Sequence, residues 1–198
     1  MRFVAGALVA AAALSSGQAQ AGELWLGAYD HDVDDAMSNG RYEAGAQVAA
    51  GLIGRPLEPL RLLGRPSPYV LAAVNTDGGA NYAAAGLSWR LKLDRAGRLY
   101  LRPGLGLAVH DRETDFPSPY EPGLTTTQRR DRFDRGRQEI DLGSRVLFQP
   151  ELALGWRVNE RMAVEASWLH LSHGQTAGGQ NPGLSDVGVR LVYGLGHR

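Results

Sequence analysis

Hydrophobic and polar residues alternate along much of this chain. In residues 98–110, leucine, proline and valine occupy every second position, and arginine, tyrosine, glycine, alanine and histidine stand between them. Successive side chains of a β-strand point to opposite faces of a sheet, so this alternation predicts a strand with one apolar face. By the same criterion, strands are predicted at 23–32, 41–49, 69–76, 82–93, 98–110, 144–158, 161–172 and 186–193.

The polar faces of these strands combine long charged residues with glycine and alanine. This mixture suits the interior of a narrow barrel, where charged side chains pair and small residues make room. The links 94–97 and 159–160 are short, whereas 111–140 and 173–184 are long, which is typical of outer-membrane barrels. The sequence therefore predicts an all-β fold, an eight-stranded antiparallel transmembrane β-barrel. The proline-rich link 51–68 is long for the short-turn side, and a short interfacial helix is one expectation for it.

The first residues have the features of a secretory signal. Arg2 precedes an apolar run from Phe3 to Leu14, and a small-x-small cleavage pattern ends at Ala21. We therefore expect a signal peptide at 1–21 and a single barrel domain at 22–198. No later run approaches the roughly 20 apolar residues of a membrane helix, and an exported chain can instead span a membrane as a closed barrel. A soluble, lipocalin-like secreted barrel is a rival interpretation.

Composition narrows the chemistry. The 198 residues contain no cysteine, which excludes disulfide scaffolds, thiolate metal sites and cysteine hydrolases. The 21 basic and 21 acidic residues balance, which argues against a nucleic-acid partner. The long link 111–140 contains six arginines, which could grip lipid phosphates, but seven acids share it, and this slightly favours a solvated loop.

The seventh predicted strand ends in a histidine and a serine at suggestive spacing. His170 and Ser172 share one face with Trp168, and this face is predicted to point out of the barrel at the outer leaflet. Residues two apart on a strand lie about 6.6 Å apart. An imidazole at that spacing can take the serine proton and activate the hydroxyl as a nucleophile. A polar rim that meets lipid headgroups explains the same pair without catalysis, and the spacing alone leaves both interpretations open.

The surrounding segments resemble a known family. Residues 170–173 (His-Leu-Ser-His), 180–184 (Gln-Asn-Pro-Gly-Leu) and 187–193 look like the signature of the lipid A 3-O-deacylases, the PagL-type outer-membrane enzymes. Segments 73–79, 85–89 and 142–148 are similar to wider stretches of the same family. The resemblance covers most of the predicted barrel domain.

The resemblance implies a serine hydrolase site that faces the membrane, with Ser172 as nucleophile and His170 as base. This chain departs from the family pattern in two places. The residue after the serine is typically asparagine, and here it is His173. The acidic third member would fall at Ser185, with Asp186 one residue later. Asp186 is the expected acid, although strand alternation points it inward, so that a bulge or loop end would have to shift it toward His170.

The expected activity is that of an outer-membrane serine esterase that removes an ester-linked 3-O-hydroxyacyl chain from lipid A of lipopolysaccharide. Backbone donors near His173 and Gly174, together with Asn181, are expected to stabilise the oxyanion, and no metal or organic cofactor is required. The alternative is a non-enzymatic eight-stranded outer-membrane barrel with a structural or binding role. The sequence leaves open whether two barrels form a homodimer.

Overall fold

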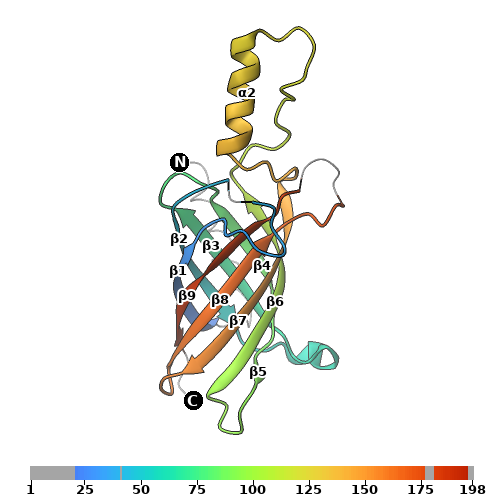
Figure 1. The fold of residues 1–198 in the computed structure, drawn as a ribbon. Coiled ribbons are helices and arrows are strands. Elements are labelled where there is room, and N and C mark those ends of the chain that lie inside the picture. Colours follow the sequence, from blue (N-terminus) through green and yellow to red (C-terminus); the bar gives the residue numbers. More distant parts are fainter. Residues whose placement is uncertain (1–20, 41, 177–180, 196–198) are drawn as a thin grey trace.

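The chain forms one closed antiparallel sheet (Figure 1). A computed structural model describes residues 21–40, 42–176 and 181–195. The predicted signal peptide at 1–21 lies outside these residues except for Ala21, as does Gln180 of the family-like segment. The strands are β1 (Ala21–Asp30), β2 (Ala46–Gly54), β3 (Ser67–Asn75), β4 (Tyr82–Ser88), β5 (Leu91–Lys92), β6 (Leu99–His110), β7 (Val146–Arg157), β8 (Met162–Leu171) and β9 (Leu184–Gly194). Neighbours in sequence pair with each other, and the pairing of β1 with β9 closes the barrel.

β4 and β5 are two parts of one barrel strand. Both pair with β6 in a single register, in which Ser88 lies opposite Gly104 and Leu91 lies opposite Leu101. The interruption falls opposite Pro103, whose carbonyl accepts a hydrogen bond from the Trp89 amide at 2.9 Å. Proline has no N–H to return, so the ladder is broken there. The barrel is therefore eight-stranded, as the sequence predicted.

The second strand lies further along the chain than predicted. It occupies Ala46–Gly54 in place of 41–49. Gly45, with φ +102°, ends the preceding loop in a conformation that side-chain-bearing residues rarely adopt. The predicted link 51–68 shortens accordingly to 55–66, and it contains the short 3-10 helix η1 (Glu58–Leu63), which leaves Leu62 and Leu63 exposed.

The barrel is apolar outside and polar inside. On β6, the side chains of Leu105, Leu107 and Val109 are about half exposed, whereas Arg102 and His110 are buried in the interior. Water-soluble proteins rarely expose a continuous apolar belt of this kind, and hydrocarbon is the solvent that suits it. Among the described residues, no helix is both long and apolar enough to cross a membrane.

Charged residues cross the interior. Glu165 of β8 is fully buried, bonds to Arg190 of β9 and accepts a hydrogen bond from Arg102 of β6 at 3.0 Å. Tyr100 donates its hydroxyl to the same carboxylate at 2.5 Å, and Arg190 also reaches Glu151 at 3.4 Å. Buried charges are tolerated when they are paired and hydrogen-bonded in this way.

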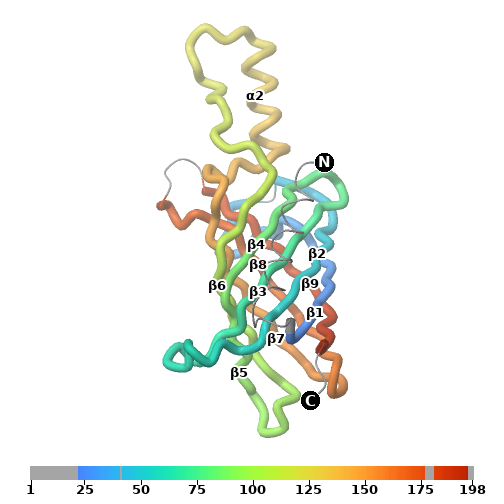
Figure 2. Tube along the Cα trace, turned by 180° about the vertical axis from the view of Figure 1, so that it is seen from behind, coloured from blue at the N-terminus to red at the C-terminus, as the bar shows by residue number. Residues whose placement is uncertain are grey.

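The two ends of the barrel differ. One carries the shorter connections and η1, and the other carries the long loops and helix α2 (Thr126–Gln138), which projects away from the barrel (Figures 1 and 2). Long loops are extracellular in outer-membrane barrels. The link 111–140 was expected to be a loop, and the structure corrects this. Thr125 and Gln128 form a reciprocal cap at the start of α2, and Arg132 and Arg135 pair with acids of the same link.

Candidate active site

The predicted histidine lies on the outward face of β8 near the extracellular end. In the β8–β9 ladder, Trp168 lies opposite Val187 and His170 lies opposite Ser185. Val187 is exposed on the barrel wall, whereas Leu169, on the other face of β8, is buried inside. The side chains of His170 and Ser185 therefore belong to the membrane-facing surface of the barrel, which agrees with the predicted alternation.

His170 is nevertheless buried, because the loop between β1 and β2 folds over it. The amide of Val33 donates to the carbonyl of Ser185 at 2.7 Å, and the amide of Asn39 donates to that of Pro182 at 2.8 Å. These bonds hold the loop across the upper ends of β8 and β9. Only 1% of the His170 surface remains exposed.

The two ring nitrogens of His170 have different surroundings. Nδ1 lies 2.9 Å from the hydroxyl oxygen of Ser185. Nε2 is buried and, among the described residues, has no hydrogen-bond partner. The indole of Trp168 stacks on the imidazole with a centroid distance of 5.6 Å and an interplanar angle of 8°. One nitrogen is thus anchored, and the other is free to accept a proton.

Ser172 follows two residues later and is held by the backbone of β7. Its amide donates to the Phe148 carbonyl at 3.1 Å, and the Phe148 amide donates to the Ser172 carbonyl at 2.7 Å. Ser172 is partly exposed, beside the exposed ring of Phe148. Its backbone is therefore fixed at the edge of the apolar belt, while a hydroxyl can turn about its own bond to reach a partner.

Gly183 packs directly against His170. A Cβ at this position would lie 2.8 Å from Cε1 of His170 and 2.6 Å from the carbonyl oxygen of Met37. Its φ of +72° is also one that other residues rarely adopt. The close packing against His170 therefore explains why the Asn-Pro-Gly segment has glycine at position 183.

The expected oxyanion residues lie just beyond β8. The backbone N–H of His173 donates to Oδ1 of Asn181 at 3.2 Å, so this donor is already engaged. The side-chain oxygen of Asn181 is occupied by the same bond, which leaves its NH₂ group as the donor. Gly174 is exposed, with φ +55°. The structure thus brings Asn181 to His173 in this segment.

The structure does not bring Asp186 to His170. The ladder between β8 and β9 continues without a bulge, and Asp186 points into the barrel opposite Leu169. Its carboxylate accepts hydrogen bonds from Nδ1 of His31 at 2.8 Å and from the Tyr82 hydroxyl at 2.7 Å. The neighbour of His170 on β9 is Ser185, the position at which the resemblance stated above implies an acid.

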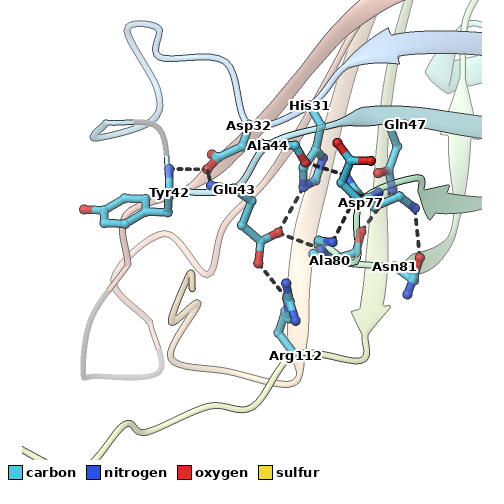
Figure 3. A network of polar contacts seen from close by, with 12 residues as sticks. His31, Asp32, Tyr42, Glu43, Ala44, Gln47, Asp77, Ala80, Asn81 and Arg112 are labelled. Carbon is cyan, nitrogen blue, oxygen red and sulfur yellow. Dashed lines mark hydrogen bonds and ion pairs between the residues drawn. The ribbon is translucent and has the colours of Figure 1, made fainter. Parts of the chain in front are cut away.

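Asp186 belongs instead to a polar network at the extracellular end of the interior. Figure 3 shows the part of this network around His31, Glu43 and Arg112. His31 bridges Asp186 and Glu43, whose carboxylate also binds Arg112 at 2.6 Å. Burial alone would lower the pKa of His31, but the hydrogen bonds to Asp186 and Glu43 raise it to about 9. The imidazolium therefore holds the first loop to the barrel wall.

Sequence reasoning missed one residue beside the site, Asp35. Its Oδ2 accepts the Trp168 indole N–H at 2.7 Å, and the Ser185 side chain is among the groups that lower the pKa of the same carboxylate. Four aspartates lie between positions 30 and 35, and no alternation distinguishes them. Asp35 can be identified as a site residue only from the structure, in which the first loop folds over β8 and β9.

Among residues 21–40, 42–176 and 181–195, no group of three or more histidine, aspartate or glutamate side chains is arranged to hold a metal ion. The groups around His170 are instead a hydroxyl, an indole and a carboxylate. This set suits proton transfer at a histidine.

A closed barrel with an apolar belt and a polar interior defines an outer-membrane β-barrel, and here a buried histidine faces the membrane beside a serine. Residues 68–194, well over half of the chain, match the family described as lipid A 3-O-deacylase (PagL). The chain belongs to this family, and its location is the bacterial outer membrane. This location overturns the soluble, lipocalin-like interpretation.

Solved structures agree on the fold. The crystal structure of the outer-membrane enzyme PagL is 10% identical, with a TM-score of 0.54, and the match covers 87% of this chain and 99% of that one. The crystal structure of Neisserial surface protein A (NspA) is 9% identical, with a TM-score of 0.51, and covers 90% and 100% respectively. No curated protein matches the chain. None of these findings supports the homodimer that the sequence left open.

Proposed function

We propose that this protein is a serine esterase that removes the 3-O-linked hydroxyacyl chain from lipid A. The observation that carries the proposal is the state of His170. It lies on the membrane-facing wall two residues before Ser172, with Nδ1 anchored by Ser185 and Nε2 buried with no partner in the part of the chain that the structure describes. Membership of the deacylase family supports the same activity.

The reaction follows from these positions. Nε2 of His170 takes the proton of Ser172, and the serine oxygen attacks the carbonyl carbon of the acyl ester. The sugar oxygen leaves with the proton from His170. Water then gives a proton to His170 and attacks the acyl carbon, and Ser172 leaves with that proton, which releases the free hydroxy fatty acid. A general base of this kind contributes about 10²- to 10⁴-fold to a rate. The mechanism uses neither a metal nor an organic cofactor.

The oxyanion needs donors on the extracellular side of Ser172. The NH₂ group of Asn181 and the backbone N–H of Gly174 are the proposed donors, and Asn181 is held in place by His173. The role proposed for His173 therefore differs from the expected one. Its backbone N–H positions Asn181 and does not bind the oxyanion itself.

The barrel wall suits the substrate. Phe148, Leu152 and Val187 are exposed on the strands that flank the site. Acyl chains of lipid A in the outer leaflet run along such a wall, so one chain can lie beside Phe148 with its ester at the level of Ser172. Apolar contacts of this kind stabilise binding by about 25 cal/mol per Å².

The test is mass spectrometry of lipid A from cells that express wild type, Ser172→Ala or Ser167→Ala. Ser167 is a matched control, because it lies on the same strand but faces the interior. We expect wild type and Ser167→Ala to remove one hydroxyacyl chain and Ser172→Ala to remove none. Unchanged lipid A with folded wild type in the membrane would overturn the proposal and favour the non-enzymatic barrel.

A further inference from the structure

The loop between β1 and β2 delivers a carboxylate to the outside of the barrel next to the histidine. Asp35 lies in this loop, and its Oδ1 accepts hydrogen bonds from the backbone amides of Met37 at 2.7 Å and Ser38 at 3.0 Å. Its Oδ2 accepts the indole N–H of Trp168 at 2.7 Å. The carboxylate is therefore fixed in position by donors from two separate parts of the chain.

Two side chains, Ser185 and Trp168, link Asp35 to His170. Ser185 interacts with both groups: its hydroxyl oxygen lies 2.9 Å from Nδ1 of His170, and its side chain helps to lower the pKa of the Asp35 carboxylate. Trp168 also contacts both, because its N–H binds Asp35 and its ring stacks on the imidazole. The histidine thus lies between two side chains that both interact with one carboxylate.

The proposed role of Asp35 implies one tautomer of His170. A serine hydroxyl has one proton to donate, and a carboxylate can only accept. In the proposed arrangement, the Ser185 hydroxyl donates toward the Asp35 carboxylate, and its lone pairs face Nδ1 of His170. Nδ1 must then carry the ring proton, which leaves the lone pair on Nε2, the buried nitrogen without a partner among the described residues.

We propose that Asp35 is the acidic positioning residue of the esterase site and acts on His170 through Ser185. The proposal rests on the proposed function. It explains how a chain with serine at the family's acid position retains a carboxylate for its base: the acid comes from a different loop, and the serine connects it to the imidazole. As in other hydrolases, such an acid orients the base and stabilises the imidazolium that forms.

The electrostatic surroundings are consistent with this role. Burial would raise the pKa of Asp35, but the hydrogen bonds from Trp168, Met37, Ser185 and Ser38 lower it, so the carboxylate is ionised at neutral pH. Among the described residues, Asp35 is the charged group that acts on His170 from the loop packed over it. β8 and β9 contribute Trp168 and Ser185 on this face, and Asp186 faces the interior.

The first experiment compares Asp35→Asn with Asp34→Asn in the full barrel, refolded in detergent with lipid A as substrate. Asp34 is the matched control, because it is the exposed neighbour and, among the described residues, its carboxylate accepts from the amide of Gly40 and not from the groups around His170. We expect Asp35→Asn to lower kcat by at least about tenfold with little change in KM, and Asp34→Asn to behave as wild type.

The pH profile separates positioning from a structural role. The acidic limb of the kcat/KM profile reports protonation of the free enzyme's base. Loss of the Asp35 charge makes the imidazolium less favourable, so the limb moves to lower pH in Asp35→Asn and stays in place in Asp34→Asn. A limb that stays in place in both variants would contradict the proposal, even if Asp35→Asn were less active.

Rescue supplies the second test. Ser185→Asp in the Asp35→Asn background places a carboxylate next to Nδ1 of His170, and we expect activity to rise above that of Asp35→Asn alone. Asp35→Asn with wild-type activity and an unchanged profile would overturn this inference while leaving Ser172 as the nucleophile. Wild type that is folded and inactive would instead overturn the proposed function itself, so the two failures are distinguishable.

Discussion

Nδ1 of His170 lies 2.9 Å from the hydroxyl oxygen of Ser185, its direct cross-strand neighbour on β9. A neutral side chain therefore occupies the place next to the histidine at which the family pattern has an acid. Serine is short enough to leave room for Asp35 behind it, and it can accept from one group while it donates to the other. In the proposed mechanism, this contact leaves Nε2 as the ring nitrogen available to Ser172.

Removal of that contact should impair the reaction. Ser185→Ala leaves Nδ1 of His170 without its acceptor, so the ring loses its orientation and its preferred tautomer. We expect kcat to fall by roughly 10- to 100-fold, as for other residues that orient a functional histidine, with KM nearly unchanged. Steady-state kinetics on lipid A in detergent micelles measure both constants. A large rise in KM with normal kcat would mean that Ser185 contacts the substrate.

Gly183→Ala should damage the site through sterics. Both Gly183, with φ +72°, and Gly123, with φ +86°, are left-handed, so alanine costs about 1–2 kcal/mol at either position. Only at Gly183 would the new Cβ meet the imidazole of His170, whereas Gly123 has no atom within 4 Å. We expect Gly183→Ala to lose most activity and Gly123→Ala to retain it. Equal activities would show that the close approach is unimportant.

The interior charges should matter for stability. Glu165→Gln keeps the volume of the side chain but leaves Arg190 and Arg102 buried beside a neutral amide. Breaking a buried pair on one side costs about 3–5 kcal/mol. Glu121→Gln, which breaks the more exposed pair with Arg132, should cost less than about 1 kcal/mol. Urea unfolding of the refolded barrels compares the two variants, and similar midpoints would contradict the difference.

Stability should also depend on the protonation of His31. Its pKa is raised from 6.5 to about 9 in the fold, against the effect of burial, by Asp186 and Glu43. The resulting stabilisation, about 3 kcal/mol, is fully present below pH 6.5 and is lost as pH rises through about 9. We therefore expect the urea midpoint of wild type to fall between pH 7 and 10. The urea midpoint of His31→Gln should be lower than that of wild type at pH 7 and should change little up to pH 10.

Alternation predicted the barrel well because each face of a strand meets one environment. Lipid outside and a crowded polar interior impose the same period of two on all eight strands, and the parity that turned His170 outward followed from it. The second strand was misplaced because its small residues, such as Ala46 and Gly51, carry little contrast between faces. Helix α2 was missed because it has no buried face, and its signal was the cap formed by Thr125 and Gln128.

The site was only partly predictable for a different reason. His170 and Ser172 are two residues apart on one strand, so local spacing revealed them. Asp35 lies 135 positions before His170, and only the closure of β1 against β9 brings its loop over that strand. Asp186 was the expected acid because it is next to Ser185 in sequence. Adjacent residues on a strand point to opposite faces, so Asp186 points into the barrel. Its partners are His31 and Tyr82.

The charged side chains that cross the barrel have a consequence for permeability. Glu165, Arg190 and Arg102 interlock in the interior, with Tyr100 on the same carboxylate. A solute or hydrated ion would have to displace these pairs to pass. These pairs therefore oppose passage through the interior, and the proposed reaction takes place on the outer wall of the barrel.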